Sequence, residues 1–316
     1  MALIRQNLYF QLSKLSLSRQ FERLRPIESP FFIICLHGSL HLVDLCLKYI
    51  PANQKVVLIS NGLSKWEIAW AKKNLKADDF LFLPKKVVHG VVLDLLIRSI
   101  EHPFGILDYD CFVFDPSLFL RISSIDHQSM LNALFVYSNN ELNLDFPESY
   151  MLYLNPKLIR AIQNKYGVDS KVIDYRSLSP QVKNKLLEIQ IDDNHLPEGH
   201  KKYFDTMRLW IALGIADGYK CNFIERYPTV SGPSNEIYHV GCGSSHRLDV
   251  ISKWEARGAY FWWRALETTN KWDLQQYYWN EFGKNKSQDV QLRNPDTVQK
   301  LERGYFDQVE TIISIQ

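Results

Sequence analysis

Several features that define common protein classes are missing from this chain of 316 residues. No stretch of about 18 apolar residues runs without a charge, so no membrane-spanning helix is predicted. Residues 1–25 lack a continuous apolar core and a small-residue cleavage site, so no signal peptide is predicted. The 37 lysines and arginines nearly balance the 35 aspartates and glutamates, so no overall charge favours nucleic acid as a partner. We expect a cytoplasmic protein that does not bind nucleic acid.

The chain also lacks cysteines paired at short spacing. Its five cysteines are scattered along the sequence, and three of them lie inside apolar runs. This pattern predicts small core residues in a reducing compartment and no zinc site. They are Cys35, Cys46, Cys111, Cys221 and Cys242.

Three catalytic signatures are absent as well. The chain has no Gly-x-x-x-x-Gly-Lys-Ser/Thr loop, and no Gly-x-Gly-x-x-Gly sequence follows its first predicted strand. It has no Gly-x-Ser-x-Gly nucleophile elbow either. These absences argue against a Walker-type NTPase, a dinucleotide-binding enzyme with the usual glycine-rich motif and a hydrolase with a nucleophile elbow.

What the chain does contain is a regular alternation of strands and helices from residue 31 to residue 116. Without hairpin signals, this alternation predicts an α/β fold with a mainly parallel sheet flanked by helices on both faces. Ligands of such sheets gather at the carboxyl ends of the strands. Strands are predicted over 31–36, 55–60 and 80–83 and within 104–116, and helices over 40–49, 64–75 and 87–100. Ser64 is predicted to cap the helix over 64–75, with Glu67 at the capping-box position.

The pattern changes after Pro116 and makes the predicted sheet mixed. Further strands are predicted over 129–137, 150–154, 221–224 and 236–240, with helices over 156–165 and 207–216 and a long loop over 166–203. The many aromatic residues from Trp254 onward predict a helical appendage that packs on the domain. We predict an N-terminal arm over residues 1–30, a catalytic domain over residues 31–250 and a C-terminal helical extension over residues 251–316. The basic, leucine-containing arm either docks on the domain or contacts a membrane surface.

Two carboxylates interrupt the apolar run that ends at Asp115-Pro116. On one strand Asp108 and Asp110 would point the same way, and two like charges repel. A divalent cation that carries phosphates would relieve this repulsion. The alternative is a pair of solvent-facing carboxylates at the end of an edge strand. The polar exits of the first two strands, His37-Gly38-Ser39 and Ser60-Asn61-Gly62, lie on the same predicted rim.

Two later residues are further candidates. Asp205 lies in Phe204-Asp205-Thr206, which opens a predicted helix, so it is either a functional carboxylate or an ordinary helix cap. His239 lies on a short predicted strand before a Gly/Ser turn. Taken alone, a core histidine beside an ordinary turn is the favoured interpretation of His239.

The order of these features resembles the GT-A superfamily of nucleotide-sugar-dependent glycosyltransferases. Leu107-Asp108-Tyr109-Asp110 looks like its Asp-x-Asp motif, and the helix opening at His89-Gly90 is similar in place to the glycine-initiated helix before that motif. Phe204-Asp205-Thr206 resembles the position of the catalytic acidic motif, although Phe204 stands where relatives carry a second acid. His239 resembles the C-terminal metal-binding histidine. The resemblance covers residues 31–247.

The resemblance implies a hexosyltransferase-type enzyme with a GT-A-like fold. It would move a sugar from a nucleoside-diphosphate sugar, with UDP favoured, to an acceptor hydroxyl with the help of Mn²⁺ or Mg²⁺. Asp110 and His239 would bind the metal ion, and Asp108 would support the metal ion or contact the ribose. Asp205 would be the catalytic base if the enzyme inverts the configuration of the sugar, and would position the acceptor or donor sugar if the enzyme retains it. Residues 31–116 would form the nucleotide-binding half and residues 117–250 the acceptor half.

His37, Ser39 and Asn61 would line the nucleotide pocket under the same resemblance. A saccharide, a lipid-linked molecule or a protein could be the acceptor, and peripheral membrane contact and oligomer formation stay open. One alternative is a sugar-phosphate nucleotidyltransferase, but its loop after the first strand usually carries several glycines and a cation, unlike Leu36-His37-Gly38-Ser39-Leu40. The other is a non-catalytic binding module with a structural carboxylate pair.

Overall fold

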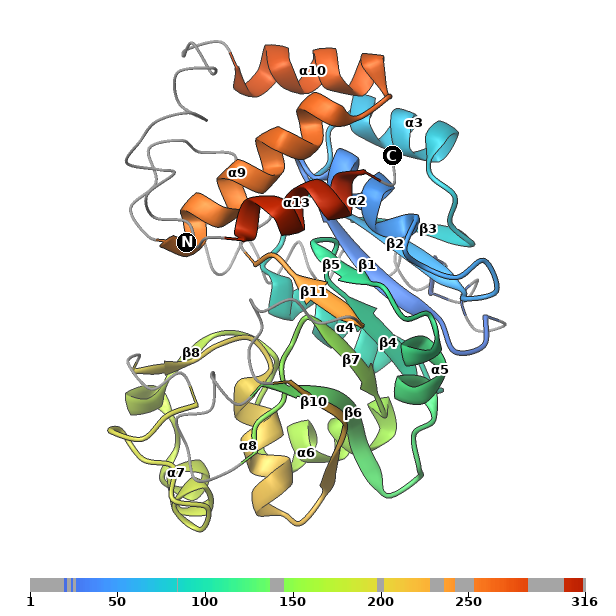
Figure 1. Ribbon diagram of the computed structural model, residues 1–316. Coiled ribbons are helices and arrows are strands. Elements are labelled where there is room, and N and C mark those ends of the chain that lie inside the picture. The colour runs from blue at the N-terminus through green and yellow to red at the C-terminus, as the bar shows by residue number, and fades with distance from the viewer. Residues whose placement is uncertain are drawn as a thin grey trace.

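A seven-stranded sheet forms the centre of the protein (Figure 1). The computed structural model describes residues 20–21, 24, 27–83, 85–136, 145–197, 202–227, 236–241, 253–283 and 304–314. The strand order is β10-β6-β7-β4-β1-β2-β3, and β7 is antiparallel to both of its neighbours while all other pairs are parallel. The predicted α/β class with a mixed, mainly parallel sheet is confirmed. The strands are β1 (Phe31–Leu36), β2 (Val56–Asn61), β3 (Asp79–Leu83), β4 (Phe104–Leu107), β6 (Ser129–Val136), β7 (Met151–Leu154) and β10 (Lys220–Tyr227).

Helices cover both faces of this sheet, as predicted. One face carries α2 (Leu40–Leu47), α3 (Lys65–Asn74) and α5 (Ser117–Ser123), together with the C-terminal helices α9 (Lys253–Thr268), α10 (Trp272–Phe282) and α13 (Tyr305–Ile313). The other face carries α4 (His89–Ser99), α6 (Pro156–Tyr166) and α8 (Arg208–Ala216), and α7 (Pro180–Leu187) packs on α8.

Alternation along each strand builds the two cores on either side of the sheet. Phe31 and Ile33 of β1 belong to the core under α2, whereas Phe32 and Ile34 belong to the core under α4. Successive side chains of a strand point to opposite faces, so a strand covered on both faces is a continuous apolar run. The sequence of β1, Phe-Phe-Ile-Ile-Cys-Leu, has this form, and its predicted bounds are confirmed.

The capping box predicted for α3 is also present. The Ser64 hydroxyl accepts a hydrogen bond from the Glu67 amide at 3.2 Å, and the Glu67 carboxylate accepts one from the Ser64 amide at 2.7 Å. This reciprocal pair satisfies backbone donors that the first turn of a helix leaves without partners. The start of α3 at the carboxyl edge of the sheet is therefore set by local sequence.

The carboxylate stretch is not a single strand, and here the prediction was wrong. Strand β4 ends at Leu107, and the chain then turns, with the Cys111 amide donating to the Asp108 carbonyl at 3.0 Å. Strand β5 (Cys111–Val113) leaves the large sheet and pairs antiparallel with β11 (Ile237–His239) in a separate two-stranded sheet. The turn therefore places Asp108 and Asp110 outside the strand ladder of the large sheet.

The long loop predicted over residues 166–203 is likewise wrong. This stretch contains α7, a short pair of strands, β8 (Ile173–Asp174) and β9 (Tyr203–Phe204), and a 3-10 turn at Tyr175–Ser177. Ser179 caps α7 and Pro180 occupies its first turn, which is a recognisable helix start. The polar composition of the segment concealed this signal.

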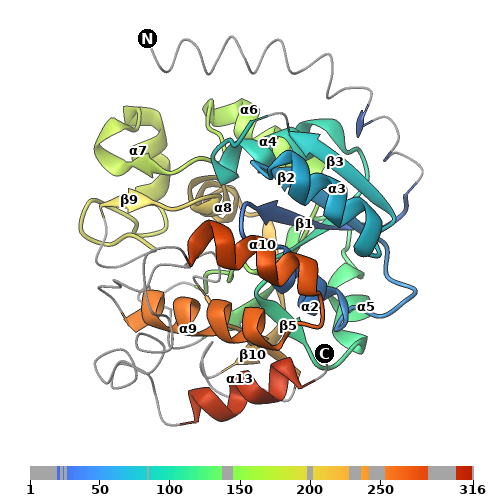
Figure 2. The same ribbon diagram turned by 90° about the horizontal axis from the view of Figure 1, so that it is seen from above.

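The aromatic C-terminal segment packs as predicted. Trp262, Trp263 and Tyr278 are fully buried in the core under α2. Helices α9 and α10, which carry these residues, contact α2 (Figure 2). None of the described helices combines the length and the apolar character needed to span a bilayer. Residues 1–19 of the predicted arm lie outside the described residues, and so does the Gly/Ser turn after Gly241. The domain boundaries at residues 30, 116 and 250 stay predictions.

Candidate metal and nucleotide site

The carboxyl edge of the sheet gathers most of the predicted site residues. Strands β1, β2 and β4 are parallel, so His37, Asn61 and the Asp108 turn lie at the same edge. Helices α4 and α8 each lead into a strand of that direction, so both helices begin at this edge. The first residues of these helices, including the turn that holds Asp205, therefore belong to the same rim.

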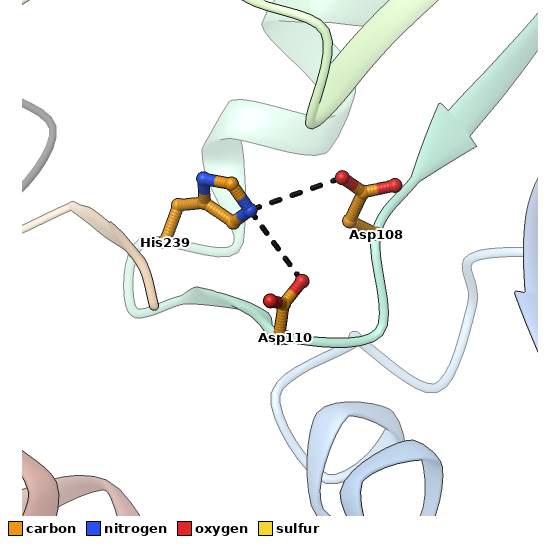
Figure 3. A group of neighbouring side chains, drawn as sticks. All are labelled: Asp108, Asp110 and His239. Carbon is orange, nitrogen blue, oxygen red and sulfur yellow. Dashed lines mark ion pairs between the residues drawn. The ribbon is translucent and has the colours of Figure 1, made fainter. Parts of the chain in front are cut away.

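Asp108, Asp110 and His239 come together in one cluster, although His239 is far from the aspartates in sequence (Figure 3). His239 Nε2 lies 3.4 Å from Asp110 Oδ1 and 3.8 Å from Asp108 Oδ2. One ligand atom of each residue lies within 4.8 Å of the others. The Asp110 side chain is 8% exposed and that of Asp108 is 33% exposed, so Asp110 lies deeper.

Backbone pairing holds this cluster in place. The β5–β11 ladder sets His239 opposite Cys111, and the Val240 amide donates to the Asp110 carbonyl at 3.0 Å. The Tyr150 ring stacks on the His239 imidazole with centroids 4.4 Å apart and planes 22° apart. The Tyr150 carbonyl also accepts the Asp108 amide at 2.9 Å. The sequence did not single out Tyr150, because only the fold places it beside both halves of the cluster.

The electrostatics of the cluster favour a cation. Burial and then the charge of Asp110 raise the pKa of Asp108 to about 7, although His239 acts in the opposite direction. Burial lowers the pKa of His239, but the charge and hydrogen bond of Asp110 and the charge of Asp108 outweigh it and raise that pKa overall. Two carboxylates and one imidazole suit Mn²⁺ or Mg²⁺, which prefer oxygen ligands and accept a nitrogen. The side chains present fit the predicted metal ion.

The loop between β1 and α2 is organised around a buried carboxylate. Glu67 is fully buried and its Oε2 lies 2.6 Å from His37 Nδ1, while its Oε1 accepts the Gly38 amide at 2.9 Å. The Tyr278 hydroxyl donates to the same carboxylate at 2.8 Å. Glu67 thus fixes the orientation of the His37 ring, whose side chain is 34% exposed. The sequence identified Glu67 only as part of a capping box.

Ser39 and Asn61 are both buried and bonded to backbone. The Ser39 hydroxyl donates to the Leu36 carbonyl at 2.7 Å and accepts the Leu36 amide at 3.0 Å. The Asn61 side-chain amide pairs with both backbone groups of Val87, at 2.9 and 2.8 Å. These bonds shape the rim from inside, and direct contact of either residue with a nucleotide stays a prediction.

Asp205 lies in a turn rather than at a helix cap. Its Oδ1 accepts the Thr206 amide at 2.7 Å, and α8 begins only at Arg208, with Met207 as the residue before the helix. Met207 has φ +70°, and no side chain caps the helix. The helix predicted over 207–216 is confirmed to within one residue, whereas the helix-cap interpretation of Asp205 is wrong. A buried methionine in the left-handed region is unusual and often marks a functional turn.

The part of the chain that contains the His37 loop and the Asp108–Asp110 turn matches a known protein family. Residues 11–159 match the StrH glycosyltransferase N-terminal domain. This match confirms the resemblance to glycosyltransferases. The StrH-matching region includes both aspartates of the cluster but neither Asp205 nor His239. The proximity of His239 to the two aspartates is therefore shown by the structure and not by the family match.

Known relatives match only parts of the chain. A dTDP-dihydrostreptose–streptidine-6-phosphate dihydrostreptosyltransferase from Streptomyces griseus is 32% identical over 92 residues, which are 29% of this chain. The match spans 24% of that relative's length.

Solved structures match this chain with low sequence identity and low TM-scores. The glycosyltransferase GlyE of Streptococcus pneumoniae TIGR4 in its apo form is 13% identical, over 61% of this chain and 44% of that chain, with a TM-score of 0.36. A cytidylyltransferase from Leptospira borgpetersenii is 12% identical, over 87% of this chain and 98% of that chain, with a TM-score of 0.37.

Proposed function

We propose that this protein is a metal-dependent glycosyltransferase that uses a nucleoside-diphosphate sugar. The observation that carries the proposal is the convergence of Asp108, Asp110 and His239 at the carboxyl edge of the sheet. The StrH-matching region supports it from the sequence side. Because the Streptomyces griseus relative is named for a dTDP-sugar, we propose dTDP as the nucleotide ahead of UDP.

The residues of the cluster divide their roles by depth. His239 and Asp110, which lies closer to it than Asp108 does, would hold the metal ion, and the more exposed Asp108 would contact the ribose or support the metal ion through water. Bound Mn²⁺ or Mg²⁺ would neutralise the charge that develops on the leaving diphosphate. Tyr150 fixes the plane of the His239 ring, so that its Nε2 stays aimed at the aspartates.

The neighbouring strand ends supply the remaining parts of the site. His37, oriented by Glu67, faces the nucleotide from the β1 edge. Asp205 is the carboxylate assigned to removal of the acceptor proton. As the new glycosidic bond forms, this proton must leave the acceptor oxygen, and an unprotonated carboxylate or imidazole on the rim can receive it. A saccharide hydroxyl is the acceptor class that this chemistry fits.

A thermal-shift panel tests the proposal. The unfolding temperature would be measured with dTDP, UDP, GDP and CDP, each with and without Mn²⁺ or Mg²⁺. We expect stabilisation by dTDP that requires the metal ion, because a ligand that binds only the folded state raises its stability. The Asp110→Asn variant should lose this response, whereas Asp307→Asn, at an exposed position on α13, should retain it. A folded protein that shows no metal-dependent response to any of the four nucleotides would contradict the proposal.

A further inference from the structure

Among the three residues predicted to line the nucleotide pocket, only His37 offers an exposed polar atom to a ligand. The Ser39 hydroxyl bonds both backbone groups of Leu36, and the Asn61 amide bonds both backbone groups of Val87. Ser39 and Asn61 are also 1% and 2% exposed, whereas the His37 side chain is 34% exposed. Within the described part of the chain, Nδ1 of His37 has a hydrogen-bond partner and Nε2 has none. A ligand at this edge would therefore meet Nε2 of His37.

The hydrogen bonds of Glu67 decide which His37 nitrogen carries a proton. Glu67 Oε1 accepts the Gly38 amide at 2.9 Å and the Tyr278 hydroxyl at 2.8 Å. Its Oε2 accepts the Ser64 amide at 2.7 Å and lies 2.6 Å from His37 Nδ1. Three fixed donors on a buried carboxyl group favour its ionised form, which only accepts hydrogen bonds. Nδ1 of His37 must then donate, because a bare nitrogen at this distance would set its lone pair against those of the carboxylate.

A neutral imidazole with its proton on Nδ1 presents a bare Nε2. This nitrogen accepts a hydrogen bond and cannot donate one. The Phe282 ring of α10 lies beside the imidazole, with ring centroids 5.3 Å apart and planes 54° apart. Glu67 and Phe282 thus hold the His37 ring from two elements, with the accepting nitrogen on the side of the ring away from the carboxylate.

The strand register indicates which part of a bound nucleotide this nitrogen would meet. Phe32 of β1 is opposite Ile106 of β4, so Asp108, two positions later, is level with Ile34. His37 comes three residues after Ile34, a rise of about 10 Å along the strand direction. In a nucleotide the ribose separates the diphosphate from the base. A diphosphate held at the metal cluster therefore places the base, rather than the phosphates, at the level of His37.

We infer that His37 contacts the nucleobase and selects thymine or uracil over cytosine. This inference rests on the proposed transferase function and adds base specificity to it. Thymine and uracil carry a proton on N3, which they can donate to the bare Nε2. Cytosine has a lone pair at N3, so it would face Nε2 with a second acceptor and leave both atoms unsatisfied. Glu67 is a positioning residue, because it acts on the base only through the tautomer and orientation of His37.

Nuclear magnetic resonance tests the tautomer without any nucleotide. In protein labelled with nitrogen-15 histidine at pH 8.5, long-range proton–nitrogen correlations distinguish a protonated ring nitrogen from a bare one. The His37→Ala variant assigns the His37 signals, and the exposed His127 at the opposite edge of the sheet provides reference signals. We expect a proton on Nδ1 of His37 and none on Nε2. A proton on Nε2 overturns the inference, whether or not the protein binds a nucleotide.

Calorimetric titration with dTDP, UDP and CDP in the presence of Mn²⁺ tests the base contact. The wild type should bind dTDP and UDP about tenfold more tightly than CDP, because an unmade hydrogen bond costs about this factor. His37→Ala should weaken dTDP and UDP binding and leave CDP binding within a few-fold, so that the preference disappears, whereas His127→Ala should retain it. A preference that survives His37→Ala overturns the inference and leaves the proposed function standing. A folded wild type that binds none of the three nucleotides overturns both.

Discussion

Tyr278 of α10 donates its hydroxyl to Glu67 of α3 at 2.8 Å, across 211 positions of sequence. The same hydroxyl accepts the Leu40 amide at the start of α2 at 3.2 Å. Trp262 of α9 adds a bond from its indole N–H to the Gly38 carbonyl at 2.8 Å. The aromatic C-terminal helices thus form one wall of the β1–α2 loop that faces the proposed nucleotide.

The first prediction concerns this wall. Tyr278→Phe removes one donor from the buried Glu67 carboxylate and should lower the free energy of unfolding by about 1–3 kcal/mol. It should also weaken dTDP binding, because the His37 ring loses part of its support. Urea denaturation and calorimetric titration measure the two effects. The neighbouring Tyr277→Phe is the control, because among the described residues that hydroxyl bonds only the half-buried Ser64, at 3.0 Å. Equal effects of the two variants would contradict the prediction.

The second prediction concerns Gly38, which has φ +86° and whose added Cβ would lie 3.1 Å from the Phe282 ring. Gly38→Ala combines backbone strain with a close contact to α10. Gly218 has φ +83° with open space around it, so Gly218→Ala measures the strain alone, about 1–2 kcal/mol. Gly38→Ala should cost more than Gly218→Ala in urea denaturation and should alone weaken nucleotide binding. Matching costs with unchanged nucleotide binding would show that the loop is not constrained by α10.

The third prediction concerns metal removal and pH. The pKa of Asp108 is raised to about 7, so the folded metal-free protein binds more protons than the unfolded chain between about pH 4 and 7. The contribution of Asp108 to the free energy of unfolding is therefore present at low pH and is lost as the pH rises through 7. Asp108→Asn should therefore flatten this part of the pH–stability curve of the metal-free protein. Saturating Mn²⁺ at pH 8 should restore stability to the wild type and much less to the variant.

Chemical denaturation from pH 5 to pH 8, with and without EDTA, measures this third effect. Asp307→Asn serves again as the control, because the carboxylate it removes is exposed on α13. A wild-type pH–stability curve that does not differ from that of Asp108→Asn would show that the pKa of Asp108 is not raised in the metal-free protein.

The fourth prediction concerns His41, which is 2% exposed and packs edge-on against Trp262. Its Nε2 lies 3.0 Å from the Trp262 carbonyl, whereas its Nδ1 is buried and has no hydrogen-bond partner within the described part of the chain. Burial lowers its pKa to about 3. Below about pH 6.5 the unfolded chain binds a proton that the folded protein excludes, so stability falls as the pH falls. Between pH 6.5 and pH 5 this single group should cost about 2 kcal/mol.

His41→Gln tests this fourth prediction by removing the titrating ring. The difference in unfolding free energy between pH 7 and pH 5 should shrink in His41→Gln and should stay as in the wild type in His127→Gln, which changes an exposed histidine. An identical loss at low pH in all three proteins would place the acid sensitivity elsewhere in the chain.

Much of the structure of residues 31–116 could be predicted from sequence because its signals are local. The apolar runs of β1 and β2 and the Ser64 capping box each depend on residues close together in the chain. Their order also predicted which strand ends share an edge. The helix α7 shows the limit of this approach, since its cap at Ser179 was present but lay in a polar stretch.

For the candidate site, too, some features follow from local sequence and others only from the tertiary structure. The sequence alone determined the alternating α/β pattern and the presence of two close carboxylates, because periodicity and like-charge spacing are local properties. Only the tertiary structure decided that the chain turns at Asp108 and Asp110, that β11 brings His239 to them, and that Tyr150 stacks on this ring. Only it placed the Tyr278 hydroxyl on the Glu67 carboxylate. The physical reason is that strand pairing and helix packing join segments whose separation along the chain carries no local signal.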